Sequence, residues 1–103
     1  MNWDKFFIIT IDNDGIPSSF NIKTFHNRLT NTNGVKAWWH YLESTYIIRV
    51  DYSVNTSHIS ELMKEIAPNK KYFTSEIKFE DYNGWLPNEA WEWIKENTNH
   101  NNG

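Results

Sequence analysis

The chain contains no cysteine, only four glycines and three prolines, and no long run of apolar residues. Without cysteine there can be no disulfide scaffold, no thiolate zinc site and no cysteine nucleophile. The apolar runs fall well short of the roughly 20 residues that a membrane helix needs. The first residues also lack the pattern of a signal peptide. We therefore expect a cytoplasmic protein that does not enter a membrane.

A surplus of positive charge is also missing. Ten Lys and Arg residues stand against thirteen Asp and Glu residues, which gives a formal net charge of -3. Proteins that bind nucleic acid strongly as monomers usually carry a basic surplus, because contacts to phosphates supply most of the affinity. The charge balance lowers the expectation of nucleic-acid binding, but it leaves room for a local basic patch.

Aromatic residues are abundant instead. They make up 17% of the 103 residues and include six tryptophans. The core of one small domain cannot easily hide six tryptophans. Some of them should therefore lie at a dimer interface or on a ligand-binding surface.

The hydrophobic pattern predicts four strands and three helices. Apolar runs and alternating apolar and polar residues predict strands at 6–11, 35–42, 45–51 and 72–79. Apolar residues at helical spacing predict two amphipathic helices, and a capping residue starts a third, shorter helix. The inward-facing residues of these helices are Ile22, Phe25, His26 and Leu29, then Ile59, Leu62, Met63 and Ile66, and finally Ala90, Trp91 and Ile94.

This order of elements predicts an α+β fold. Right-handed crossovers place the first two helices on one face of a four-stranded sheet, which is the ferredoxin-like βαββαβ sandwich, here with an extra C-terminal helix. The second face of such a sheet would be bare, so a second subunit or the Trp-rich C-terminal segment should cover it. We expect one domain over residues 1–96 and a disordered tail over residues 97–103.

The segment Trp-Trp-His-Tyr-Leu-Glu-Ser-Thr-Tyr-Ile-Ile at residues 38–48 resembles a small bacterial group called the SinR-like family. That group is similar in fold to the smaller CRISPR adaptation protein and to the GhoS-type antitoxin ribonuclease. Weaker matches lie at residues 7–12, 59–66 and 91–94. The chain departs from the pattern at Tyr46, where the group has Trp, and at Ile11, where the relatives often have Tyr.

The resemblance implies a candidate catalytic and metal-binding residue at Asp12. In the CRISPR relatives the matching aspartate ends the first strand, and two copies face each other across a dimer, where they can hold a divalent metal. Bound Mg²⁺ or Mn²⁺ would polarise a phosphate and activate water, as in a metal-dependent endonuclease. The alternative is that Asp12 only turns the chain after a strand and that no cofactor is bound.

His40 is the second candidate, as a general base or a phosphate contact with the Ser44 hydroxyl nearby. The structural alternative, which we favour, is a histidine that packs across the predicted hairpin. Side chains alternate along a strand, so Trp38 and His40 share one face and Trp39 lies on the other. One of the two adjacent tryptophans must point away from the helices, and the pattern does not decide which.

Three functions remain open on these grounds, each with a homodimer expected. The favoured one is a small, dimeric, non-catalytic adaptor or inhibitor in phage defence or counter-defence, which binds a protein partner through an aromatic surface and needs no cofactor. The second is the metal-dependent endonuclease with Asp12. The third is binding of a nucleotide or a short nucleic acid through stacking and phosphate contacts by Trp38, Trp39, Arg49 and Trp85.

Overall fold

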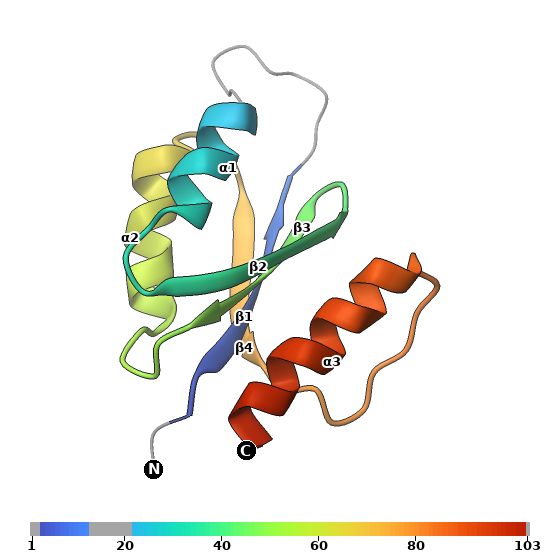
Figure 1. Cartoon of the computed structure of the whole chain (residues 1–103). Helices are drawn as coiled ribbons and strands as arrows, with labels where there is room; N and C mark the ends of the chain where they lie inside the picture. Colours follow the sequence, from blue (N-terminus) through green and yellow to red (C-terminus); the bar gives the residue numbers. More distant parts are fainter. Residues whose placement is uncertain (1–2, 13–21, 103) are drawn as a thin grey trace.

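The computed structural model describes residues 3–12 and 22–102, except for the side chains of residues 22 and 99–102. In this part of the chain, four strands and three helices confirm the predicted α+β class (Figure 1). The elements follow in the order β1 (Lys5–Ile11), α1 (Ile22–Thr30), β2 (Val35–Leu42), β3 (Thr45–Val50), α2 (Thr56–Ile66), β4 (Tyr72–Ile77) and α3 (Asn88–Asn102).

The strands form one antiparallel sheet in the order β2-β3-β1-β4. The central strand β1 is the continuous apolar run expected at residues 6–11, because a strand covered on both faces needs no polar alternation. Strands β2 and β4 are the two edges. An extra residue in β2 between Trp39 and Leu42 shifts the register against β3, as in a β-bulge.

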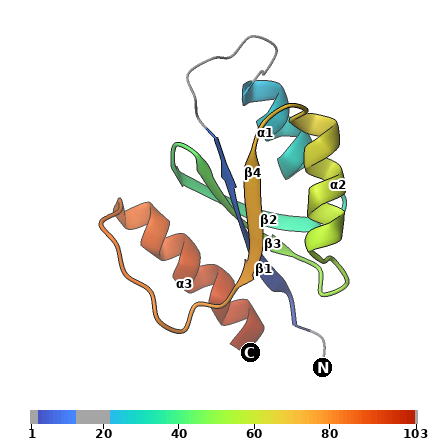
Figure 2. The same ribbon diagram turned by 180° about the vertical axis from the view of Figure 1, so that it is seen from behind.

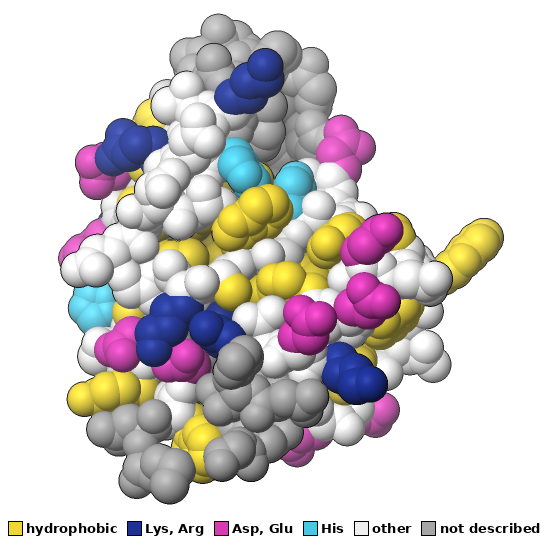
Figure 3. Space-filling model, in the orientation of Figure 1, with side chains coloured by type: hydrophobic (Ala, Val, Ile, Leu, Met, Phe, Trp, Pro, Cys, Tyr) yellow, Lys and Arg dark blue, Asp and Glu magenta, His cyan; other side chains and the backbone are white. Residues whose placement is uncertain are grey.

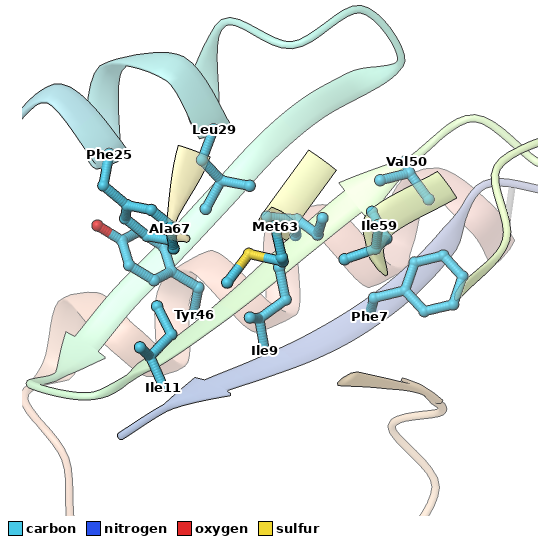
Figure 4. Close-up of a cluster of buried hydrophobic side chains, with 11 residues drawn as sticks. Phe7, Ile9, Ile11, Phe25, Leu29, Tyr46, Val50, Ile59, Met63 and Ala67 are labelled. Carbon is cyan, nitrogen blue, oxygen red and sulfur yellow. The ribbon is translucent and has the colours of Figure 1, made fainter. Parts of the chain in front are cut away.

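Helices α1 and α2 cover one face of the sheet and form the larger hydrophobic core with it (Figure 4). Phe25 and Leu29 of α1 and Met63 of α2 are almost completely buried, as their helical spacing predicts. The sheet contributes alternate residues of its two central strands, namely Phe7, Ile9, Ile11, Tyr46, Ile48 and Val50.

Local signals fix the turn after α1 and the start of α2. Gly34 lies in the connection from α1 to β2 and has φ 95°, a left-handed conformation that glycine adopts without steric cost. Asn55 caps α2, because its side chain accepts hydrogen bonds from the N–H groups of Ser57 and His58. The His58 ring in turn accepts a hydrogen bond from the N–H of Asn55, so this histidine serves the helix start.

Helix α3 covers the opposite face of the sheet. Phe6, Trp39 and Ile47 of the sheet pack against Ala90 and Ile94 of α3. Figure 2 shows α3 on one side of the sheet and the pair α1 and α2 on the other. Of the two covers expected for this face, the Trp-rich C-terminal segment is therefore the one present.

The C-terminal helix extends into the segment for which disorder was expected. Helix α3 continues to Asn102, and Asn97 is buried, with its side chain donating to the carbonyl of Trp93. Asparagine is disfavoured inside a helix, but here its amide donates within the helix to Trp93 and its Oδ1 accepts a hydrogen bond from Arg49 of β3. Among the described residues, no helix combines the length and apolar character required to cross a bilayer.

Candidate functional site

Three of the predicted site residues meet at one end of the sheet, where β1 ends and the β2–β3 turn lies. The N–H of Ile11 donates to the carbonyl of Ser44, and the N–H of Asp12 donates to the carbonyl of Lys71, both at 2.9 Å. His40 lies near the same end, two residues before the end of β2. The antiparallel topology thus brings Asp12, His40 and Ser44 into one region of the molecule.

Arg49 and Trp85 lie elsewhere. Arg49 is toward the other end of β3, where its Nε is 3.3 Å from Oδ2 of Asp4 and an NH₂ group donates to Oδ1 of Asn97 at 2.8 Å. It therefore ties β3 to the N-terminal segment and to α3. Trp85 lies in the connection between β4 and α3 and is 99% exposed.

The ring of His40 lies flat on the ring of Tyr46, with centroids 4.0 Å apart and an interplanar angle of 0°. Its Nδ1 is 2.9 Å from the carbonyl oxygen of Thr45. A carbonyl can only accept a hydrogen bond, so Nδ1 carries the proton and Nε2 of the neutral ring is left as an acceptor. The ring packs across the β2–β3 hairpin, which is the structural arrangement that we favoured for this residue.

A second histidine completes the cluster. Nδ1 of His26, on α1, lies 2.9 Å from the hydroxyl of Tyr46. Burial raises the pKa of Tyr46 above its ordinary value, so the phenol stays neutral and keeps a proton to donate. The His26 ring also meets the ring of Trp38 edge to face, with centroids 4.6 Å apart. We call His26, His40, Tyr46 and Trp38 the histidine–aromatic cluster.

Sequence reasoning placed His26 only on the inner face of a helix and treated Tyr46 as a substitution for Trp. The sequence carried only a weak signal for the contact between His26 and Tyr46. A tyrosine in the centre of a buried run needs a partner for its hydroxyl, and His26 was the polar residue on the facing helix stripe.

The adjacent tryptophans have different environments. Trp39 is 2% exposed and packs under α3, where its Nε1–H donates to the carbonyl of Ala90 at 3.2 Å. Trp38 is 42% exposed on the side of α1. Trp38 is therefore the member of the pair that is available for an interaction, whereas Trp39 is a core residue.

The described residues of one chain do not fit a divalent metal at Asp12. In the described ranges, no group of three His, Asp or Glu side chains could hold a metal ion. Nζ of Lys70 lies 3.5 Å from the backbone oxygen of Asp12, and a positive charge that close opposes a bound cation. A metal site here would need further ligands from outside the described residues of this chain.

The exposed apolar residues of β2 lie along one edge of the sheet, with Trp38 on the side of α1 and Tyr41 beside Trp39 on the side of α3. Trp38, Tyr41 and Leu42 are each more than one-third exposed on this edge strand. Figure 3 shows an interrupted band of hydrophobic side chains across the face of the molecule that carries β2, with two histidines beside it. We call Trp38, Tyr41 and Leu42 the β2 aromatic edge.

No protein-family model, curated protein or solved structure matches the chain.

Proposed function

We propose that the chain is a small, homodimeric, non-catalytic adaptor or inhibitor that acts through the β2 aromatic edge. The observation that carries this proposal is the exposure of Trp38, Tyr41 and Leu42 on a strand that has a neighbour on one side only. Tryptophan and tyrosine are enriched in protein–protein interfaces, because they bury a large area at a small cost in conformational entropy.

The strand order supports pairing through an edge. Helix α3 covers the face that would otherwise be free, so the sheet cannot pair with a second copy through the part of that face under α3. An edge strand offers unpaired N–H and C=O groups to another strand. Of the two edges, β2 is the more aromatic, and we assign it to self-association.

We also infer the ferredoxin-like arrangement for the fold. The order β2-β3-β1-β4 supports this inference, because both βαβ units enclose a third, antiparallel strand between their two strands. Helices α1 and α2 lie on the same face, as two right-handed crossovers require.

The contacts of the polar candidates favour binding over catalysis. His40 is stacked on Tyr46 and bound to a carbonyl, and Arg49 is engaged by Asp4 and Asn97. The stacking and phosphate contacts of the nucleotide-binding hypothesis would need Trp39 and Arg49 at the surface. The metal-dependent endonuclease would need a second carboxylate beside Asp12.

The test is the oligomeric state of the wild type, of Trp38→Ala and of Trp85→Ala, measured by sedimentation over a concentration series. We expect the wild type to be a dimer. Trp38→Ala should weaken association by about 2 kcal/mol, or roughly thirtyfold. Trp85→Ala removes a tryptophan that is more exposed but lies off the edge, so it should leave association unchanged.

A wild-type chain that stays monomeric at the highest concentration would overturn the dimer. Equal effects of the two substitutions would overturn the assignment to β2. A tagged wild type should also retain a discrete protein partner that Trp38→Ala loses, and retention by both variants would remove the β2 aromatic edge from the proposed binding surface.

A further inference from the structure

The second edge of the sheet borders a groove of different chemistry. An open groove of about 660 Å³ runs between α2 and the edge strand β4. Figure 2 shows the two elements side by side, with β4 at the outer edge of the sheet. The residues that matter here are Ser57 and Ser60 of α2 and Lys70, Lys71, Phe73 and Thr74 in and before β4.

The backbone of β4 is open toward this groove. The N–H of Asp12 donates to the carbonyl of Lys71, so the backbone carbonyl of Lys71 points toward the β1 side. Backbone direction alternates along an antiparallel strand, and the polar groups of Tyr72, Thr74 and Glu76 therefore point away from β1. Among the described residues, these outward groups make no hydrogen bond to other backbone groups, and the carbonyl of Glu76 accepts one from the hydroxyl of Ser75.

A buried hydroxyl in the groove also lacks a partner. Oγ1 of Thr74 is shielded from solvent and has no hydrogen bond in the described part of the chain. Its neighbour Tyr72, by contrast, hydrogen-bonds the Ser60 hydroxyl across the groove floor. A buried hydroxyl without a partner destabilises the free protein, and a small shift of β4 on strand addition would let it bond a donor or an acceptor of the ligand.

The charge of the groove is opposite to that of the chain. The formal net charge is -3, yet Lys70 and Lys71 line the groove, and none of the described lining residues carries a carboxylate. On the other face of β4, Phe73 is 64% exposed and offers an apolar contact. An added strand would place alternate side chains on these two sides, some beside Thr74 and the others beside Phe73.

We propose that the groove binds an extended acidic peptide segment, which adds to β4 as a fifth strand. Main-chain hydrogen bonds to Tyr72, Thr74 and Glu76 supply affinity, and the lysines select acidic residues. Nucleic acid is the other anionic candidate. The outward backbone groups of this edge strand favour a peptide, because a nucleic acid cannot continue a β-ladder. The site lies on the edge opposite the β2 aromatic edge and does not depend on the proposed dimer.

The experiment uses an octapeptide of alternating valine and glutamate, blocked at both ends, and follows backbone amides of the labelled protein by NMR. We expect binding to slow hydrogen exchange at Thr74 and Glu76. The amides of Phe73 and Ser75 already bond to β1 and should change little. The same peptide N-methylated at alternate residues, and a peptide with lysine for glutamate, should not bind.

Four variants separate the contributions. Lys71→Glu should weaken binding of the acidic peptide about tenfold and should strengthen binding of the lysine peptide. Thr74→Val removes the hydroxyl that has no partner and should weaken binding of the peptide. Ser75→Ala, on the other side of the strand, should leave binding unchanged. Trp38→Ala should bind the peptide like the wild type, which separates this site from the proposed dimer.

Several results would overturn the proposal. Equal exchange rates of the Thr74 and Glu76 amides with and without the acidic peptide would show that the peptide does not bind to β4. Equal binding of the N-methylated peptide would exclude strand addition. Protection of the same amides that grows with protein concentration would assign the edge to a second copy, and protection by single-stranded RNA alone would assign it to nucleic acid.

Discussion

Replacing Trp39 by alanine should destabilise the fold far more than replacing its neighbour Trp38. Trp39 is 2% exposed, packs against α3 and donates to the carbonyl of Ala90, whereas Trp38 is 42% exposed. Truncation of a buried tryptophan costs about 3–5 kcal/mol, of which a hydrogen bond accounts for about 1 kcal/mol. We expect about 1 kcal/mol or less for Trp38→Ala, because a half-exposed side chain leaves no closed cavity.

A milder variant separates packing from hydrogen bonding. Trp39→Phe keeps an aromatic ring under α3 but loses the Nε1–H group that binds Ala90. It should cost about 1–2 kcal/mol from the lost hydrogen bond and the smaller ring. This variant keeps the prediction testable if Trp39→Ala does not fold, because a domain of this size has only about 5–15 kcal/mol of stability.

The assay is urea denaturation followed by far-ultraviolet circular dichroism. The stability of a dimer depends on protein concentration, so each variant is measured at several concentrations. If the stability lost in Trp38→Ala becomes smaller at high protein concentration, the substitution weakens association. If the loss is the same at every concentration, the substitution destabilises the fold of the monomer. Equal intrinsic losses for the two alanine variants would refute the assignment of Trp39 to the core and Trp38 to the surface.

Two further predictions concern the sheet end. Tyr46→Phe should lower stability by about 1 kcal/mol at neutral pH, because His26 loses its partner. The raised pKa of Tyr46 adds stability that is fully present below pH 10.0 and is lost as the pH rises through the folded-state value. Urea midpoints should therefore fall more steeply in alkali for the wild type than for Tyr46→Phe, and equal slopes would contradict the buried phenol. Neither wild type nor Asp12→Asn should cleave labelled single-stranded RNA or double-stranded DNA with Mg²⁺ or Mn²⁺. Cleavage by the wild type that Asp12→Asn abolishes would establish the endonuclease in place of the adaptor.

The order and type of the elements could be predicted from the sequence because they depend on local spacing. The apolar run of β1 and the helical stripe that ends at Ile66 are each visible within one segment. The end of β4 was less accurate, since the alternation continues to Phe79 while the strand ends at Ile77. Phe79 still packs in the second core, but it lies beyond the last residue paired with β1.

The candidate site was predicted only in part. Asp12 and Ser44 lie together because the end of one strand meets the start of its antiparallel neighbour, and this follows from the element order. The roles of Arg49 and Trp39 did not follow from it. Both were candidates for ligand contacts, and both are engaged within the fold by segments more than forty residues away.

The sequence by itself determined the α+β class, the succession of strands and helices, and the alternation that separates Trp38 from Trp39, because periods of 2 and 3.6 residues are properties of the local backbone. Only the tertiary structure decided which tryptophan faces inward, that α3 covers the second face, and that His26, His40 and Tyr46 meet. It also decided that the hydroxyl of Thr74 is buried without a partner among the described residues. These features depend on register and on contacts between distant segments, where a shift of one residue exchanges the two faces of a strand.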